Sequence, residues 1–312
     1  MRAVKPVRSN VAAATRSALG ESLAAARGRI APPAPRIESL DWLDSLHELA
    51  VDDGFFAIRN IAARCRHVFD RGRLVVNERQ ENDWYFCKTD HLEYFFERVA
   101  PRKPFILFSG HSDASVGRRY RRYLRRPELR AWFAANATLA HPKLQSLPVG
   151  IANPLTGWPN ADRSVLEHVR AADIPKSRLF YVRFEMHTNP TERERCLQET
   201  GLPLDPPSEF PRYLEELASS YFCLSPAGKG IDCHRTWESL HLRTIPVVTR
   251  SLLTDQHRDF PIVALENWSD FGSVPFSPDL HRAVWNAWSR RAISLDGYLE
   301  RVATVIRKLE AL

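Results

Sequence analysis

Short apolar runs alternate with stretches of helical spacing along most of the chain. In the first half, Asp83–Thr89 and Pro104–Ser109 are apolar runs rich in aromatic residues, and both predict buried strands. Leu92–Val99, which lies between them, predicts a helix. Strands that alternate with helices indicate a parallel sheet with helices on its faces. The hydrophobic pattern therefore predicts an α/β fold.

Other segments extend this alternation toward both ends of the chain. Leu295–Leu312 has a clear helical stripe of apolar residues. Thr191–Thr200 also predicts a helix, with Thr188 or Asn189 as its N-cap. The other expected strands lie at Gly54–Arg59, Leu179–Phe184 and Phe260–Leu265, with strand ends at Ala137–Ala140 and Leu147–Ile151. The other expected helices lie at Ile37–Ala50, Val165–Ala171, Pro206–Ala218 and His281–Trp288.

The most informative stretch is Tyr221–Val248. Its first part, Tyr221–Leu224, predicts a buried strand, and Ser225–Asp232 predicts a loop marked by proline and glycine. His234–His241 predicts a helix, and Thr244–Val248 a second strand. A strand, a loop, a helix and a strand in this order form the repeating unit of a parallel sheet.

The loop and the helix start of this unit favour an anion. Backbone N–H groups at a helix N-terminus attract negative charge, and Lys229 and Arg235 add positive charge there. Glu238 follows Arg235 by three residues on the same helical face, where a carboxylate can accept hydrogen bonds from the hydroxyls of a ribose. Simple turn chemistry and a surface ion pair of Arg235 with Glu238 explain the same residues, and the loop matches neither of the usual phosphate-loop patterns.

The stretch FCLSPAGKGIDCHRTWESLHLRTIPVV resembles the donor-binding segment of the exostosin-like glycosyltransferases, which have GT-B architecture. Two further stretches, LPVGIAN at 147–153 and YVRFEMHTNPTERERCL at 181–197, resemble a subgroup near the ribitol-phosphate xylosyltransferases. The resemblance implies a GT-B type α/β fold with two Rossmann-like parallel-sheet domains facing a cleft. The implied division is a basic flexible tail at 1–36, an acceptor domain at 37–152, a nucleotide-sugar donor domain at 153–277, and C-terminal helices at 278–312 that pack back on the acceptor domain.

The resemblance also implies an activity, namely the transfer of a sugar from a nucleotide-sugar to a hydroxyl of a glycan or glycolipid acceptor. Inversion at the sugar carbon is expected. Independence of metals is expected because the chain contains no DxD motif, and no cofactor is expected. Ion pairing of Arg193 and Arg195 with neighbouring glutamates is an alternative to a pyrophosphate contact at that helix start. The expected donor-binding residues are Arg183, Asn189, Arg193, Gly228, Lys229, Gly230, Asp232, His234, Arg235 and Glu238.

The catalytic base is expected in the loop after the strand at Pro104–Ser109. Asp113 is the first candidate and His111 the second, because ligands of parallel sheets bind beyond the carboxyl ends of the strands. Asp232 is a third candidate, and a reaction without an enzymic base stays open. The alternative for the loop is a polar turn in which Ser112 or Asp113 caps the next helix.

The net charge of +7 suits acidic partners. Seven arginines lie within residues 117–130, interleaved with tyrosine and leucine. Three interpretations stay open for this run, which are a nucleic-acid contact, a solvated helix face, and the binding of an anionic acceptor or of lipid head groups. Peripheral contact with an anionic membrane is therefore possible on charge grounds, whereas nucleic acid is not favoured because no nucleic-acid motif is present.

Composition also bears on location. No apolar run reaches about 18 residues, and the five cysteines lack metal-site spacing, so we expect a cytoplasmic protein with reduced thiols that could lie at a membrane surface. Residues 1–36 are basic and poor in acidic residues, which is typical of a loose tail and also of an organelle-targeting segment. Two other classes stay open, an inactive nucleotide-sugar-binding protein and a basic nucleic-acid-binding protein.

Overall fold

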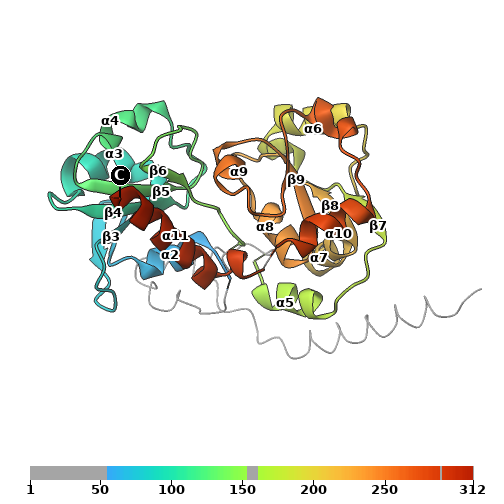
Figure 1. The fold of residues 1–312 in the computed structure, drawn as a ribbon, viewed down its shortest axis with the longest axis horizontal. Helices are drawn as coiled ribbons and strands as arrows, with labels where there is room; N and C mark the ends of the chain where they lie inside the picture. The colour runs from blue at the N-terminus through green and yellow to red at the C-terminus, as the bar shows by residue number, and fades with distance from the viewer. Residues whose placement is uncertain (1–54, 153–160, 289, 312) are drawn as a thin grey trace, which may run out of the picture. The chain divides into compact units, whose positions relative to one another are not determined.

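The computed structural model describes residues 55–152, 161–288 and 290–311, which form two sheets with flanking helices (Figure 1). One sheet has six strands in the order β2-β1-β3-β4-β5-β6, and the other has four strands in the order β10-β9-β8-β7. Every pairing is parallel except that of β1 with β2. The predicted α/β class with two sheets of mainly parallel strands is confirmed.

The first sheet is built around β4, in which all six residues are buried. Aromatic side chains of β3, β4 and β5 pack on one another, as in the stack of Phe108 on Phe133 at 5.1 Å between ring centroids. The predicted strands at Asp83–Thr89 and Pro104–Ser109 are confirmed as β3 and β4. The strands are β1 (His67–Asp70), β2 (Arg73–Val76), β3 (Trp84–Lys88), β4 (Phe105–Gly110), β5 (Leu129–Ala134) and β6 (Leu144–Ser146).

Two predictions about this sheet are wrong. Within Gly54–Arg59, only single bridges form at Phe55 and Ala57, and helix α2 (Ile58–Arg64) begins there instead of a strand. Apolar residues at three- and four-residue spacing, which suits a helix better than a strand, explain this outcome. The strand ends predicted at Ala137–Ala140 and Leu147–Ile151 are not found, because both segments lie outside the strands. Strand β5 was not predicted, because its apolar residues lie at the end of the arginine run.

The helical segments of the first half are short. The predicted helix at Leu92–Val99 is confirmed as α3 (Leu92–Tyr94) continued by one π-helical turn, η2 (Phe95–Val99). A 3₁₀ turn η1 (Thr89–His91) precedes it. The arginine run forms a 3₁₀ turn η3 (Arg118–Tyr120) and one turn of α-helix, α4 (Arg121–Leu124).

The second sheet contains the unit predicted for Tyr221–Val248. Strand β8 (Ser220–Leu224), helix α8 (His234–His241) and strand β9 (Ile245–Thr249) confirm it almost residue by residue. Asn189 accepts a hydrogen bond from the Glu192 amide as N-cap of α6 (Pro190–Thr200), which confirms the predicted cap. The other elements are β7 (Arg178–Tyr181), β10 (Val263–Leu265), α5 (Arg163–Ala171), η5 (Met186–Thr188), α7 (Phe210–Ala218), α9 (Leu252–Gln256), η6 (Trp268–Ser273) and α10 (Pro278–Asn286).

The C-terminal helix α11 (Leu295–Glu310), which follows the 3₁₀ turn η7 (Arg290–Ile293), buries its apolar stripe in the core of the first sheet. Leu295, Tyr298 and Val302 lie in one cluster with Phe108 and Phe133. The Arg130 guanidinium at β5 forms an ion pair with Glu310 near the end of the helix. The last apolar residues of the chain therefore complete the core around the first sheet.

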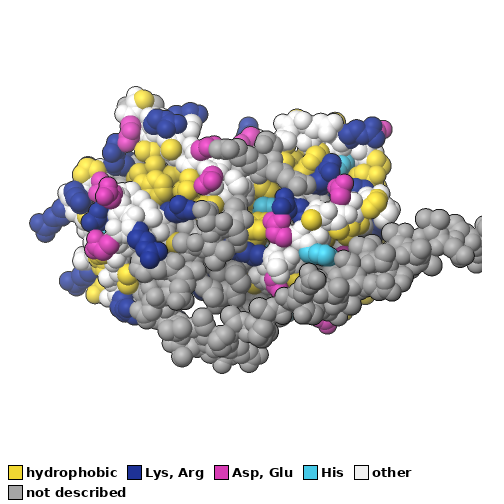
Figure 2. Space-filling model, turned by 90° about the horizontal axis from the view of Figure 1, so that it is seen from below, with side chains coloured by type: hydrophobic (Ala, Val, Ile, Leu, Met, Phe, Trp, Pro, Cys, Tyr) yellow, Lys and Arg dark blue, Asp and Glu magenta, His cyan; other side chains and the backbone are white. Residues whose placement is uncertain are grey.

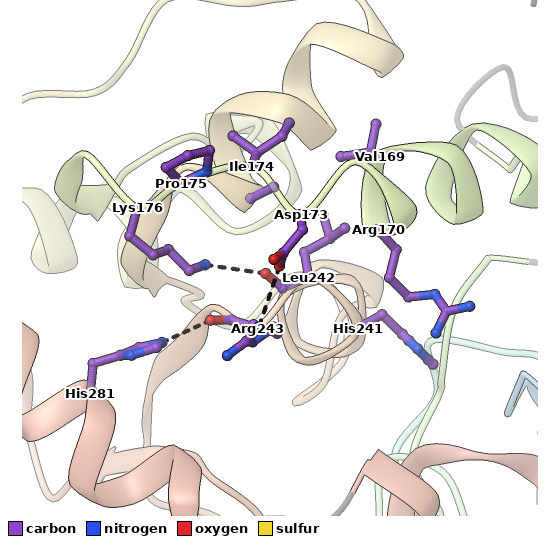
Figure 3. Close-up of a pocket in the computed structure, with 11 residues that line it drawn as sticks. Val169, Arg170, Asp173, Ile174, Pro175, Lys176, His241, Leu242, Arg243 and His281 are labelled. Carbon is purple, nitrogen blue, oxygen red and sulfur yellow. Dashed lines mark hydrogen bonds and ion pairs between the residues drawn. The ribbon is translucent and has the colours of Figure 1, made fainter.

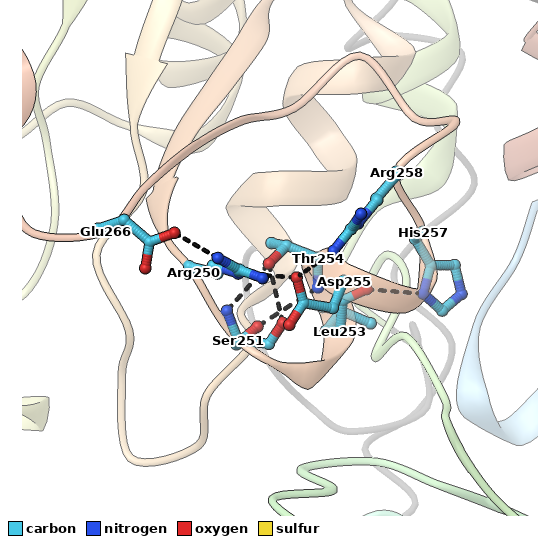
Figure 4. A network of polar contacts seen from close by, with 8 residues as sticks. All are labelled: Arg250, Ser251, Leu253, Thr254, Asp255, His257, Arg258 and Glu266. Carbon is cyan, nitrogen blue, oxygen red and sulfur yellow. Dashed lines mark hydrogen bonds and ion pairs between the residues drawn. The ribbon is translucent and has the colours of Figure 1, made fainter. Parts of the chain in front are cut away.

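Helix α9 contacts the free edge of β6. The Gln256 side chain donates a hydrogen bond to the Leu144 carbonyl at 3.1 Å and accepts one from the Ser146 amide. Around the start of α9, Arg250 lies between Asp255 and Glu266 in a network of polar contacts (Figure 4). The predicted helix at Ile37–Ala50 and the basic tail lie outside the described residues, so the domain limits remain a prediction.

Candidate functional site

A cavity of about 300 Å³ lies at the N-terminal end of α8. Five of the predicted donor-binding residues line it, and they come from β7, α6 and α8 or from the segments beside them. The five are Arg183, Arg193, His234, Arg235 and Glu238. Aromatic side chains complete the wall, namely Tyr181, Phe184, Phe210 and Tyr213. The cavity thus combines cations, the carboxylates of Glu185 and Glu238, and flat apolar surface.

The start of α8 is open toward this cavity. Cys233, the residue before the helix, provides no side-chain cap, so the first-turn N–H groups are not satisfied by it. Two hydrogen bonds of Ser225 fix the first residue of the loop before the helix. The Ser225 amide donates to the Val247 carbonyl at 2.8 Å, and the Ser225 hydroxyl hydrogen-bonds Thr236 at 2.9 Å. A helix N-terminus without a side-chain cap is a suitable place for an anion.

Glu238 is the buried carboxylate of the cavity, with only 6% of its surface exposed. The Tyr213 hydroxyl donates to its Oε2 atom at 2.5 Å, and its Oε1 atom makes no hydrogen bond with any described residue. Burial raises the pKa of Glu238, while Tyr213, His234 and Arg235 act in the opposite direction. One carboxylate oxygen is therefore fixed by the protein and the other is available to a ligand.

Three arginines surround the same cavity. The guanidinium carbons of Arg193 and Arg235 each lie 5.5 Å from the ring centroid of Phe184. Burial, and then the charge of Arg235, lower the pKa of Arg193, which reflects how close the two cations are. The Arg235 Nε atom is buried without a hydrogen-bond partner among the described residues. Arg183 is paired with the exposed Glu185 at 2.6 Å. An anionic ligand would relieve the repulsion between these arginines.

Asn189 and Arg193 also hold the loop that precedes α8. The Asn189 Nδ2 atom donates to the Gly228 carbonyl at 3.0 Å, and the Arg193 Nε atom donates to the Ala227 carbonyl at 3.2 Å. A Cβ atom on Gly228 would lie 3.2 Å from the Arg193 guanidinium. Because both polar atoms of the Asn189 side chain are used within the protein, its contact with a pyrophosphate stays a prediction.

Gly230 approaches Asn136, a residue that the sequence analysis did not select. A Cβ atom on Gly230 would lie 2.5 Å from the Asn136 Oδ1 atom, so no other residue fits without a shift. The same Oδ1 atom accepts from the Ile231 amide at 3.0 Å, and Nδ2 donates to the Ser112 carbonyl at 3.1 Å. Asn136, buried and with a φ of 55°, thus joins the loop before α8 to the loop after β4.

Asp232 and His234 form hydrogen bonds within the protein. The Asp232 carboxylate accepts from the Val149 amide at 2.9 Å, from the Trp237 indole N–H and from the Cys233 amide. Burial raises the pKa of Asp232 to about 6, and these N–H groups act in the opposite direction. The His234 Nδ1 atom donates to the Gly150 carbonyl at 2.7 Å, so the Nε2 atom of the ring points away from that carbonyl. Lys229 is exposed at the tip of the loop.

The two predicted base residues differ in their surroundings. The His111 Nε2 atom accepts a hydrogen bond from the Arg59 guanidinium at 3.0 Å, because a guanidinium can only donate. Burial, and then Arg59 and Lys88, lower the pKa of His111 to about 4, so the ring is neutral at pH 7. Asp113 is exposed. The prediction that Ser112 or Asp113 caps a helix is wrong, because the next helical turn begins at Arg118 after Gly117.

Two polar pairs at the carboxyl ends of the first sheet also escaped the sequence analysis. The His91 Nε2 atom lies 3.2 Å from the Asp70 Oδ1 atom, and Asp70 is buried. The Ser112 hydroxyl donates to Asp90 at 2.7 Å. No spacing in the sequence marks these pairs, because each joins residues from different strand ends. Tyr213 lay within a predicted helix, but only the fold shows that the helix faces α8.

A second cavity of about 320 Å³ lies at the opposite, C-terminal end of α8 (Figure 3). Its charged side chains are engaged with protein groups. The Lys176 ammonium donates to the Leu242 carbonyl, and Arg243 pairs with Asp173 at 3.3 Å. The His281 Nε2 atom donates to the Arg243 carbonyl at 2.8 Å. This cavity contains none of the predicted site residues.

Within residues 55–152, 161–288 and 290–311, no group of three or more histidine, cysteine, aspartate or glutamate side chains is placed to bind a metal ion. The helices of this same part of the chain are all too short or too polar to cross a membrane.

Comparison with known proteins finds similarity at the level of the fold. No protein-family model matches the sequence, and no curated protein matches it significantly. The fold resembles the crystal structure of AviGT4, described as a glycosyltransferase involved in avilamycin A biosynthesis, with 14% identity and a TM-score of 0.29. The match covers 74% of this chain and 86% of AviGT4. At this TM-score the similarity carries no argument about the site.

Proposed function

We propose that this protein is a glycosyltransferase that moves a sugar from a nucleotide-sugar donor to a hydroxyl of a glycan or glycolipid acceptor. The observation that carries the proposal is the cavity at the start of α8, where Glu238 and Arg235 are buried and each keeps a polar atom without a partner among the described residues. An α/β protein that binds a nucleotide at the carboxyl end of a parallel strand follows the general rule for such sheets.

Each part of a nucleotide-sugar has a matching group in this cavity. The free Oε1 atom of Glu238 accepts hydrogen bonds from the ribose hydroxyls. Arg235, Arg193 and the N-terminus of α8 neutralise the diphosphate, and Arg183 can exchange Glu185 for it. The rings of Phe210 and Tyr213, 6.0 Å apart, offer a surface for the base.

The reaction step follows from these assignments. The acceptor hydroxyl loses its proton to a base, its oxygen bonds to the anomeric carbon, and the bond from that carbon to the phosphate oxygen breaks. The electron pair of the broken bond leaves with the nucleoside diphosphate, whose charge the arginines stabilise. In this proposal the sugar carbon is inverted and no metal ion takes part.

We assign the base to Asp113 rather than to His111. The Asp113 carboxylate is exposed, whereas the lone pair of His111 Nε2 is used by Arg59. The Ser112 carbonyl next to Asp113 is joined through Asn136 to Ile231 in the loop before α8, which supports placing this residue near the donor. An exostosin-like subgroup near the ribitol-phosphate xylosyltransferases is the family we propose. The five free cysteines, four of them buried, favour a reducing compartment such as the cytoplasm.

A hydrolysis screen tests the proposed activity. The full-length protein is incubated with a panel of nucleotide-sugars, with and without a chelator, and release of the nucleoside diphosphate is measured. We expect release from at least one donor, unchanged by the chelator and strongly reduced in Asp113→Asn. Binding of a donor without any release, even with added glycan acceptors, would make the protein an inactive nucleotide-sugar-binding protein. Dependence on an added divalent ion would contradict the metal-independent step.

A further inference from the structure

The arginine run at 117–130 is not used by the proposed site, and the structure divides it into two groups. Arg122 pairs with Glu97 at 3.3 Å, the Arg126 guanidinium donates to the Phe96 carbonyl, and Arg130 pairs with Glu310. Arg119 lies over the ring of Tyr120 at 4.5 Å. The remaining arginines, Arg118, Arg121 and Arg125, are exposed and form no hydrogen bond or ion pair with any described residue.

These three residues, which we call the arginine face, lie at three- and four-residue spacing along η3 and α4. Residues at this spacing are neighbours on one side of a helical turn, so their like charges repel one another. Nearby cations add to the field, because Arg121 and Lys143 both contribute to lowering the pKa of His141, after burial. An unpaired cationic face of this kind is stabilised by an anionic partner.

Three exposed arginines of the second half are different. Arg212, Arg258 and Arg282 each lie within 3.4 Å of a carboxylate oxygen one helical turn away. The arginine face therefore stands out because three neighbouring arginines all lack a carboxylate partner among the described residues. On the side of the molecule seen in Figure 2, Lys and Arg side chains also gather over the half that contains the first sheet.

The aromatic residues of the run indicate the kind of partner. Tyr120 and Tyr123 are 2% and 7% exposed, so neither ring is available to stack on a nucleic-acid base. The face spans only roughly 10 Å, at 1.5 Å per helical residue, which is short for tracking a nucleic-acid strand. On the adjacent α3, whose continuation η2 contacts α4 through the stack of Phe96 on Tyr123, Tyr94 is 55% exposed. Exposed tyrosine and arginine together suit the interface of a membrane.

We propose that the arginine face docks this protein on an anionic lipid surface. The partner is a bilayer that displays phosphate head groups, and Arg118, Arg121 and Arg125 are the residues that contact it. Head groups in a fluid bilayer can move to each guanidinium, so no shaped groove is needed. The inference does not depend on the glycosyltransferase assignment, because it rests on different residues and needs no substrate.

Vesicle binding tests the inference with a matched control. The full-length protein is sedimented with phosphatidylcholine vesicles, with and without phosphatidylglycerol. The first variant is Arg118→Gln/Arg121→Gln/Arg125→Gln, and the control is Arg212→Gln/Arg258→Gln/Arg282→Gln. Both lower the net charge from +7 by three, to +4, so general charge effects are equal. Circular dichroism confirms that both variants are folded.

We expect the wild-type protein and the control to bind anionic vesicles, and the arginine-face variant to bind about 100-fold more weakly, since each basic residue near such a surface contributes about fivefold. Equal weakening in both variants would overturn the inference, as would the absence of any binding to anionic vesicles. If the arginine-face variant bound anionic vesicles as tightly as the wild type, the contact would lie elsewhere, for example in the basic tail, and the inference would be overturned. A different partner would show itself on duplex DNA. If the wild type and the control bound DNA but not vesicles, and the arginine-face variant lost DNA binding, the partner would be a nucleic acid and the inference would be overturned.

Discussion

The two ends of helix α8 each border a cavity of similar size, about 300 Å³ at the N-terminal end and about 320 Å³ at the C-terminal end. At the C-terminal end, Lys176, Arg243 and His281 are bound to protein groups. At the N-terminal end, Arg235 and Glu238 are buried, and each keeps an atom that has no partner in the part of the chain that the structure describes. The two cavities have similar volumes. They differ in whether their charged side chains have hydrogen-bond partners among the described residues.

The direction of the helix adds to this contrast. An anion is favoured at the N-terminal end by the helix dipole, and disfavoured at the C-terminal end. A buried charged group without a partner destabilises a fold, so its presence indicates a role that the folded protein alone does not fulfil. This contrast explains why we assign the nucleotide to the cavity at His234–Glu238.

The largest expected effect on nucleotide binding distinguishes the removal of an arginine at one end of α8 from the removal of one at the other end. Arg235→Ala should weaken the binding of a nucleoside diphosphate by 100-fold or more, because a charge-assisted hydrogen bond to phosphate is worth about 3 kcal/mol when desolvated. Arg243→Ala at the other cavity should leave binding unchanged. Titration calorimetry measures both. Equal losses in the two variants would contradict the distinction between the cavities.

A smaller effect is expected when the loop before α8 is displaced. The Cβ atom of Gly230→Ala would overlap the Asn136 side chain, and relieving such a clash costs about 1–3 kcal/mol of stability. Gly272→Ala is the matched control, since nothing lies within 4 Å of its added Cβ atom. We expect a lower unfolding temperature and weaker nucleotide binding only in Gly230→Ala. If that variant bound nucleotide as the wild type does, the loop would not position the site.

The pH dependence of stability should have opposite signs at the two ends. Burial raises the pKa of Glu238, so its contribution to stability is present at acidic pH and is lost as the pH rises through that raised pKa. Burial lowers the pKa of His281, so its contribution is present above the unfolded value of 6.5 and is lost as the pH falls through the lowered pKa.

Two variants separate these contributions in thermal unfolding curves recorded across pH. Glu238→Gln should gain stability relative to the wild type at neutral pH, while it binds the nucleotide more weakly. His281→Gln should lose less stability than the wild type on acidification below pH 6.5. A Glu238→Gln protein that is less stable than the wild type at neutral pH would show that the ionised carboxylate is already satisfied within the fold.

The smallest effect is expected for Lys176→Gln. The Lys176 ammonium donates to the Leu242 carbonyl and to the Thr244 hydroxyl, so its loss should cost about 1 kcal/mol of stability. Nucleotide binding should not change. Any loss of binding in this variant would indicate that the C-terminal cavity contributes to the site.

The sequence predicted the parts of this picture that are local in the chain. A strand, a glycine-containing loop and a helix with Arg235 and Glu238 three residues apart are all readable within Tyr221–Val248. The N-cap Asn189 is local as well. For these elements, short-range periodicity and turn chemistry suffice.

The missing parts depend on contacts between distant residues. Tyr213 meets Glu238 across 25 positions, and Asn136 meets Ile231 across 95, so no spacing rule reveals either contact. Strand β5 was hidden because the arginine run continues to Arg130, inside the strand. Whether an arginine of that run has a carboxylate partner is also decided only by the fold.

Discrimination between ribose and deoxyribose tests the central claim most directly. Calorimetric titration compares a nucleoside diphosphate with its 2′-deoxy form, for the wild-type protein, Glu238→Gln and the control Arg243→Ala. The account predicts that the wild type and the control prefer the ribose form by about tenfold or more, the worth of a hydrogen bond to a carboxylate, and that Glu238→Gln loses the preference. Absence of binding by any nucleoside diphosphate, or an equal preference in Glu238→Gln, would contradict it.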